Sequence, residues 1–265
     1  MRISERSDGD VAPNATDPRA AAVQRLAEPG ATPYRSVTMT AKPPILVFDL
    51  DGTLADTAGD IINTLNVVLD REGLPPVPAA SARKMIGAGA KTLIKRGFEA
   101  QGRELPPEML ERLYRDFIVH YNAHIAIETR LFPGVEAALD RFAAAGYIFA
   151  VCTNKIEHSS RLLLKALGVD ERFRAICGQD TFKVPKPDRK IFDGAVAQAG
   201  GDLERAVMVG DSATDIATAR AADAPVVAVN FGYTDQPIES FSPDKVISHY
   251  DELWDAVGSL NASAA

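Results

Sequence analysis

The chain has 265 residues, of which 46% are hydrophobic and 25% are charged, and its formal net charge is −7 at pH 7. This length and apolar content suffice for a sizeable core in one or two domains. The acidic balance disfavours nonspecific binding to nucleic acid or to an anionic membrane surface, and no apolar run approaches the roughly 20 residues of a membrane span.

Residues 1–42 differ in composition from everything that follows. They combine Ser, Asp, Pro, Ala, Gly and Thr with scattered arginines, and they lack the apolar centre of a secretory signal. We predict that this segment is a disordered N-terminal extension. Met39 stands just before the first predicted strand, so a start site assigned too far upstream and a genuine extension both remain open.

The first strong apolar run ends in two carboxylates. The sequence Ile45-Leu-Val-Phe-Asp49-Leu-Asp51-Gly-Thr53-Leu54 passes from branched and aromatic residues to two aspartates and a glycine. Asp49 is expected at the carboxyl end of a strand, and Asp51 is expected to turn toward the same space from the loop. Two acids at the open end of a buried strand are costly unless a cation or a reaction uses them. The pair therefore predicts a metal site that contains a nucleophile.

A helical block follows this run directly. Residues 57–129 show no convincing strand pattern, and apolar residues recur with helical spacing over 60–72 and 108–123. We predict a separate helical domain over residues 57–129, inserted beside the two carboxylates, where it can act as a lid. The α/β domain then consists of residues 43–56 and 130–265.

After the block, strand-like and helix-like segments alternate. Predicted strands cover residues 147–152, 175–177, 206–209, 225–229 and 245–247. Predicted helices cover residues 135–144, 157–167, 189–199 and 213–221. This alternation predicts a parallel sheet with helices on both faces, and such sheets bind ligands outside the carboxyl ends of their strands.

The chain contains two cysteines, Cys152 and Cys177, and both lie in apolar, strand-like stretches. A single disulfide between them is one interpretation. We instead predict two buried free thiols in a reducing compartment, and hence a cytoplasmic protein.

Further strand ends also carry polar residues. Thr153 and Asn154 follow a buried strand where a helix begins, a position that favours anions but also suits ordinary helix caps. Lys186 lies between two prolines on a stiff loop before a helix. Asp211 and Asp215 follow a strand and a glycine. They also fit a simpler interpretation, in which Asp211 is a helix cap and Asp215 is an acid in the first turn of the helix.

Together these strand ends resemble the four motifs of the haloacid dehalogenase superfamily of aspartate-nucleophile phosphotransferases, over about residues 45–257. In chain order, the matching positions are Asp49-Leu-Asp51-Gly-Thr53-Leu54, then Thr153, then Lys186, and finally Gly210-Asp211-Ser212-x-x-Asp215. The resemblance implies a Rossmann-like core, with a parallel sheet flanked by helices. It also implies a helical cap domain of the C1 type, inserted after the first strand.

The superfamily's chemistry assigns roles to the aspartates. The resemblance implies that Asp49 attacks phosphorus and forms an aspartyl-phosphate. Asp51 would protonate the leaving oxygen and later take a proton from water. Mg²⁺ would be held by the Asp49 carboxylate, the Asp51 backbone carbonyl and the Asp211 carboxylate.

The resemblance also assigns residues around these aspartates. Thr153, Asn154 and Lys186 would bind the phosphoryl oxygens. Asp215 would lie behind the metal ligands or occasionally join them.

Individual residues separate the branches of the superfamily. Dehalogenases lack the second aspartate and phosphonate-cleaving members carry alanine there, so Asp51 disfavours both. Phosphosugar mutases keep both aspartates. However, the stretch from Asp51 to Ile61, and the segment from Ile86 to Lys91 followed by Arg96, look more like the phosphoglycolate phosphatase branch than like a mutase.

The expected reaction is therefore the Mg²⁺-dependent hydrolysis of 2-phosphoglycolate to glycolate and phosphate. Lys91 and Arg96 in the helical block are candidates to bind the carboxylate of the substrate. The alternatives are a phosphatase for a sugar phosphate or nucleotide, a phosphosugar mutase, and a catalytically silent binding module. The expected partner is a small phosphorylated metabolite rather than nucleic acid or a membrane, and the expected state is a monomer or homodimer.

Overall fold

The computed structural model describes residues 41–234 and 236–263. The extension predicted for residues 1–42 thus lies outside the described residues, apart from its last two positions. Within the described part, no helix is both long enough and apolar enough to cross a membrane.

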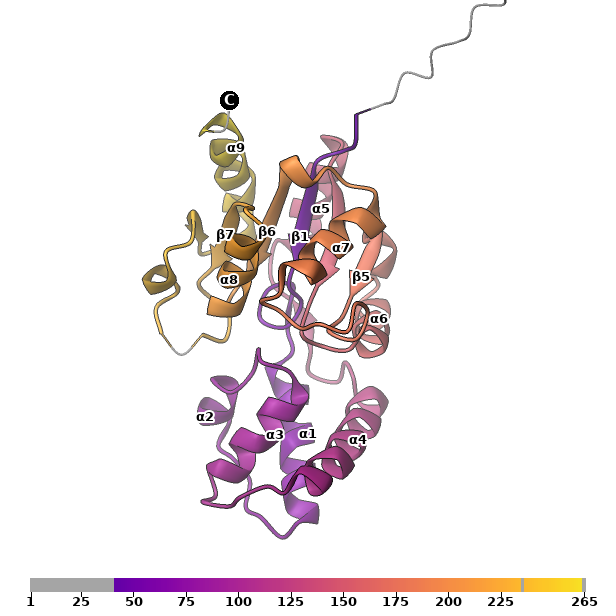
Figure 1. The fold of residues 1–265 in the computed structure, drawn as a ribbon, viewed down its shortest axis with the longest axis vertical. Helices are drawn as coiled ribbons and strands as arrows, with labels where there is room; N and C mark the ends of the chain where they lie inside the picture. The colour runs from indigo at the N-terminus through magenta and orange to yellow at the C-terminus, as the bar shows by residue number, and fades with distance from the viewer. Residues whose placement is uncertain (1–40, 235, 264–265) are drawn as a thin grey trace, which may run out of the picture. The chain divides into compact units, whose positions relative to one another are not determined.

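A six-stranded parallel sheet, in the order β5-β4-β1-β6-β7-β8, forms the centre of the α/β domain (Figure 1). Its strands are β1 (Ile45–Phe48), β4 (Ile148–Cys152), β5 (Ala175–Cys177), β6 (Ala206–Gly210), β7 (Val226–Val229) and β8 (Lys245–Ile247). The chain winds outward in opposite directions on the two sides of β1. A crevice for ligands is therefore expected at the carboxyl end of β1.

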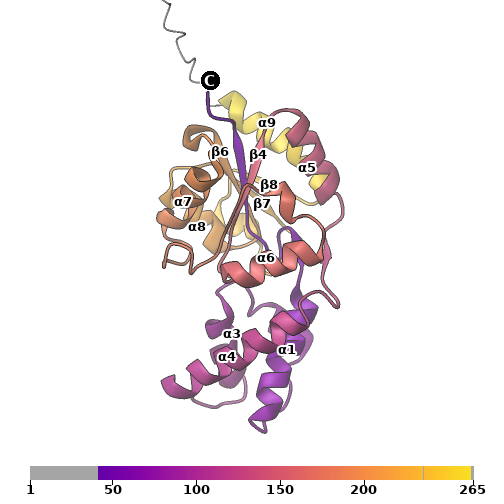
Figure 2. The same cartoon turned by 90° about the vertical axis from the view of Figure 1, so that its right-hand side faces the viewer.

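Helices cover both faces of this sheet, as the sequence predicts (Figure 2). One face packs against α5 (Val135–Ala144), α6 (Glu157–Ala166) and α9 (Leu253–Ser263), and the other against α7 (Arg189–Ala199) and α8 (Ala213–Ala221). Side chains alternate along β1, so that Leu46 and Phe48 enter one core while Ile45 and Val47 enter the other. The run of buried apolar residues in β1 is explained by this two-sided packing.

Between β1 and β4 the chain forms a helical insertion, which we define as helices α1 to α4. These are α1 (Ala58–Arg71), α2 (Ala79–Arg83), α3 (Ala90–Glu99) and α4 (Pro107–Ala123), and they have an apolar core of their own. The insertion lies beyond the carboxyl ends of the strands (Figure 1). The two helices predicted from spacing correspond to α1 and α4, whereas the division into domains remains a prediction.

A short antiparallel ribbon connects the insertion to the sheet. It pairs β2 (Ala55–Asp56) with β3 (Arg130–Leu131). The sequence does not predict these strands, because two residues are too few for an alternating pattern.

The two cysteines lie opposite one another on β4 and β5, and Cys152 is in register with Cys177. Both are buried and both are free thiols. This agrees with the prediction of buried thiols and not with the alternative of a disulfide.

Candidate active site

The carboxyl ends of three neighbouring strands bring the polar residues of the motifs together. Asp49 follows β1, Thr153 and Asn154 follow β4, and Asp211 follows β6, and all four are buried. Asp49, Asp211 and Asp215 offer carboxylate oxygens that lie within 4.8 Å of one another. The expected acidic cluster is therefore present at the switch point of the sheet.

Asp211 is held in place by hydrogen bonds and by close packing. Its Oδ1 accepts from Thr53 Oγ1 at 3.1 Å, and its Oδ2 accepts from the Tyr233 N–H at 2.7 Å. Gly52 and Gly232 pack against the same carboxylate, and a Cβ on either would lie within 2.3 Å of Asp211 Oδ2. Gly52 has a φ of +86°, so both its conformation and its surroundings require glycine.

Lys186 connects the proposed nucleophile to Asp215. Its Nζ lies 2.9 Å from Asp49 Oδ1 and 2.5 Å from Asp215 Oδ1. The other oxygen of Asp215 accepts from the Asp211 N–H, the Ser212 N–H and the Ser212 hydroxyl. The N-cap of α8 is Ser212 and not Asp211, whereas Asp215 is the first-turn acid that the simpler interpretation proposed; Asp215 forms a capping box with Ser212 and also holds Lys186 against the site.

Burial and neighbouring carboxylates raise the pKa of Asp49 and of Asp211. Burial raises the pKa of the Asp49 carboxyl to about 6, despite the opposing effect of Lys186. Burial, followed by repulsion from Asp215 and Asp49, raises the pKa of Asp211 well above its ordinary value. Lys186 contributes one positive charge against these three carboxylates. An all-oxygen cluster with excess negative charge has the chemistry that suits a hard divalent cation such as Mg²⁺.

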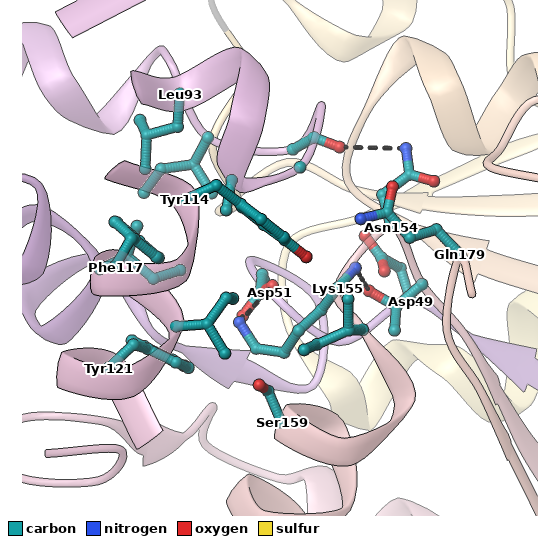
Figure 3. A pocket seen from close by; sticks show the side chains of 18 residues that line it. Asp49, Asp51, Leu93, Tyr114, Phe117, Tyr121, Asn154, Lys155, Ser159 and Gln179 are labelled. Atoms are coloured by element: carbon teal, nitrogen blue, oxygen red, sulfur yellow. Dashed lines mark hydrogen bonds and ion pairs between the residues drawn. The ribbon is translucent and has the colours of Figure 1, made fainter. Parts of the chain in front are cut away.

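Asp51 is paired with Lys155, for which the sequence predicts no role. Lys155 Nζ donates to both carboxylate oxygens of Asp51 at 2.9 Å, and both side chains are nearly buried, with 9% and 12% exposed (Figure 3). The same ammonium lies 4.5 Å from the centre of the Tyr121 ring. Burial opposes charge on Lys155, but Asp51 and Tyr121 outweigh it and raise the pKa of the lysine. The available signal was that Lys155 directly follows Thr153 and Asn154 at a strand end.

The side chain of Asn154 holds two loops together. Its Oδ1 accepts from the Lys186 N–H at 2.8 Å, and its Nδ2 donates to the carbonyls of Lys186 and Gly87, both at 3.4 Å. Gly87 belongs to the helical insertion, so Asn154 also joins the insertion to the α/β domain. The binding of phosphate by Asn154 remains a prediction, and its side chain is engaged elsewhere.

A cavity of about 50 Å³ lies between the helical insertion and the α/β domain (Figure 3). Its α/β side contains Asp49, Asp51, Thr153, Asn154, Lys155 and Gln179, among others. Its insertion side is mostly apolar and includes Ile61, Leu93, Tyr114, Phe117, Ile118 and Tyr121. A space of this size holds only a few water molecules.

The two cations predicted to bind the substrate's carboxylate lie outside this cavity. Lys91 Nζ is 2.5 Å from Glu111 Oε1, and its side chain is 45% exposed. Arg96 Nη1 donates to the Met85 carbonyl at 2.9 Å, and Arg96 lines a neighbouring cavity of about 160 Å³ that also includes Asp211. Their role in specificity remains a prediction.

Comparison with known proteins identifies the family. Residues 46–229 match the model of the haloacid dehalogenase-like hydrolases. The chain belongs to this family. It is therefore a hydrolase, and the resemblance inferred from its four motifs is confirmed.

Individual members of the family are similar over most of the chain. A phosphoglycolate phosphatase from Mesorhizobium japonicum is 49% identical over 210 residues, which cover 79% of this chain and 92% of the relative. One from Agrobacterium fabrum is 43% identical over 221 residues, covering 83% and 95%. The crystal structure of a predicted phosphoglycolate phosphatase from Haemophilus somnus 129PT has a TM-score of 0.75 at 29% identity, and the match covers 82% of this chain and 98% of that one.

Proposed function

We propose that this hydrolase is a Mg²⁺-dependent phosphatase that converts 2-phosphoglycolate to glycolate and phosphate. The observation that carries the proposal is the buried cluster of Asp49, Asp211 and Lys186, with Asp51 beside it at a small cavity. The relatives named phosphoglycolate phosphatase, at up to 49% identity, support the choice of substrate.

Asp49 is the proposed nucleophile. A phosphate monoester hydrolyses slowly in water, so its hydrolysis requires alignment and charge stabilisation. Asp49 attacks phosphorus and forms an aspartyl-phosphate, which water then hydrolyses. Lys186 touches Asp49 already and is fixed by Asp215, so its ammonium stabilises negative charge next to the reacting group.

Asp51 is the proposed acid and base. Its carboxyl gives a proton to the ester oxygen as the alcohol leaves, and it then takes a proton from the water that attacks the aspartyl-phosphate. Asp51 lines the same cavity as Asp49, so both groups have access to one small molecule.

The carboxylates of Asp49 and Asp211, with the backbone carbonyl of Asp51, are the residues that would hold Mg²⁺. The ion would neutralise charge on the phosphoryl oxygens and on the buried carboxylates. Thr53 and Tyr233 fix the Asp211 carboxylate through the hydrogen bonds described above. Thr153, at the end of β4, remains the candidate to bind a phosphoryl oxygen.

The helical insertion is the proposed cap that closes over the substrate. Its loop at Gly87 contacts Asn154, and its helices supply the apolar side of the cavity. Such a wall excludes water from the aspartyl-phosphate.

A substrate panel tests the proposal. Purified protein should hydrolyse 2-phosphoglycolate with a kcat/KM at least tenfold above that for any hexose or nucleotide monophosphate, and chelation of Mg²⁺ should abolish the activity. A tenfold preference for another monoester would contradict the substrate while leaving phosphatase activity intact. Release of a second phosphorylated sugar instead of free phosphate would indicate a mutase. No turnover of any ester by folded protein with Mg²⁺ would favour a binding module.

A further inference from the structure

The cavity next to Asp49 is lined by neutral polar side chains such as Thr153, Asn154 and Gln179 and by one cationic side chain. Among the described residues that line it, Lys155 supplies the one cationic side chain. Lys91 and Arg96, the cations favoured by the sequence, do not line it. A cation here would stabilise a second anionic group on the substrate most strongly, because the apolar part of the wall, with Ile61, Leu93 and Phe117, cannot compensate its lost hydration.

The length of the substrate restricts where its carboxylate can lie. In 2-phosphoglycolate, a single methylene separates the ester oxygen from the carboxylate. The residue that binds the carboxylate must therefore lie close to the residue that protonates the ester oxygen. Lys155 meets this condition, because its Nζ is 2.9 Å from the carboxylate oxygens of Asp51.

We propose that Lys155 recognises the carboxylate of the substrate, and that on substrate binding it exchanges Asp51 for this carboxylate. The inference rests on the proposed function, because it assigns a partner to the carboxylate of 2-phosphoglycolate. In the structure, both carboxylate oxygens of Asp51 accept hydrogen bonds from Lys155 Nζ. A carboxylate that takes over the lysine frees Asp51 to serve the ester oxygen, so recognition of the substrate and release of the acid become one event.

The surroundings of Lys155 suit such an exchange. Its side chain is almost buried, and Tyr121 lies beneath its ammonium at 4.5 Å from the ring centre, so the cation keeps a favourable contact while its anionic partner changes. Figure 3 shows Lys155 reaching along the cavity to Asp51, with Tyr114, Phe117 and Tyr121 on the facing helix. One carboxylate replaces another, so the lysine is never left without a partner.

The first experiment compares two substrates that differ only in the carboxylate. These are 2-phosphoglycolate and ethyl phosphate, assayed with wild type, Lys155→Met and the control Lys165→Met, which changes an exposed lysine on α6. Lys155→Met should lower the ratio of the two kcat/KM values by about 10- to 100-fold, the usual worth of a hydrogen bond to a charged group. Lys165→Met should leave the ratio unchanged. An equal loss on both substrates would overturn the proposal, since it would mean that Lys155 only positions Asp51.

A second experiment uses binding alone, so it does not depend on turnover. Calorimetry should compare 3-phosphonopropionate, a non-hydrolysable mimic, with propylphosphonate, which lacks the carboxylate. Lys155→Met should weaken only the first. Asp51→Asn should strengthen the first relative to the second, because Lys155 no longer has to leave an anionic partner. The increase in affinity of Asp51→Asn can be measured even if the Lys155→Met variant does not fold.

The outcomes separate this inference from the proposed function. If wild type hydrolyses 2-phosphoglycolate but Lys155→Met and Asp51→Asn leave carboxylate selectivity unchanged, only the role of Lys155 fails. If Lys91→Met or Arg96→Met removes that selectivity instead, the role passes to the cap cations and the inference is wrong. If wild type prefers other monoesters, the proposed function fails, and the calorimetric comparison still decides whether Lys155 binds carboxylates.

Discussion

The two sides of the cavity are built in opposite ways. On the α/β side, Asp49 lines the cavity and belongs to a cluster of four almost fully buried charged groups. The other three, Asp211, Asp215 and Lys186, each make several hydrogen bonds or ion pairs. On the insertion side, the wall consists largely of aliphatic and aromatic side chains from α1, α3 and α4. Lys155 belongs to the α/β side but faces this wall, where it contacts Tyr121.

This difference separates the chemistry from the choice of substrate. Buried charges tolerate little change, because removing one partner leaves the others without compensation. An apolar wall tolerates substitution more easily. It selects among ligands by their size and by leaving their polar groups without hydrogen-bond partners. We therefore expect substitutions on the α/β side to abolish turnover, and substitutions facing the insertion to alter selectivity.

The largest effect should come from the nucleophile. Asp49→Asn should lower turnover of 2-phosphoglycolate by at least about 10,000-fold, because the amide cannot form the aspartyl-phosphate. The unfolding temperature should stay within a few degrees of wild type, since the amide keeps the shape of the side chain. Appreciable Mg²⁺-dependent activity in this variant, measured after correction for contaminating phosphatases, would show that Asp49 is not the nucleophile.

Lys186→Met should lower both the activity and the free energy of unfolding. It leaves Asp49 and Asp215 buried without their shared cation, which should lower the free energy of unfolding by about 3–5 kcal/mol. Denaturant titration measures this loss, and Lys190→Met, which changes an exposed lysine on α7, is the matched control. A loss below 1 kcal/mol would mean that the ammonium contributes little to holding the acidic cluster.

Gly52→Ala should weaken the binding of Mg²⁺. The added Cβ would lie 2.3 Å from Asp211 Oδ2, so the carboxylate must shift. We expect the affinity for Mg²⁺, measured by calorimetry, to fall by about 10- to 100-fold. The control is Gly73→Ala, which has a similar φ of +69° but no atom within 4 Å of the new Cβ. It should cost stability without changing Mg²⁺ affinity, and equal effects of the two variants would contradict the argument from packing.

The smallest effect should be the pH dependence of stabilisation by Mg²⁺. The pKa of Asp49 is raised from 3.8 to about 6, so its contribution to the stability of metal-free protein is full below pH 3.8 and is lost as pH rises through about 6. Mg²⁺ binds the ionised carboxylate and competes with the proton. The rise in unfolding temperature on adding Mg²⁺ should therefore be larger at pH 7 than at pH 5, by roughly 5 °C. A larger rise at pH 5, seen by calorimetric scanning, would contradict this sign.

Much of the fold follows from short stretches of sequence. The apolar runs and the helices between them predict the parallel sheet, because both patterns are local and repeat along the chain. The ribbon of β2 and β3 escaped prediction, since two-residue strands carry no period. The contribution of Tyr233 and Lys155 to the site was not predicted for a different reason. It depends on partners that are far away in the chain.

The sequence by itself determined the family, the α/β class and the positions of Asp49, Thr153 and Asp211 at the ends of strands, with Asp51 and Lys186 on loops beyond them. Only the tertiary structure decided what each of these residues touches. Asp51 and Lys155 are 104 residues apart, and Tyr233 contacts Asp211 through a backbone N–H that carries no sequence signal. Lys91 looks like a ligand for an anion in the sequence, yet it is paired with Glu111 outside the cavity. Local patterns fix which residues reach the end of a strand, whereas the pairing of charges depends on how the strands and the helical insertion pack together.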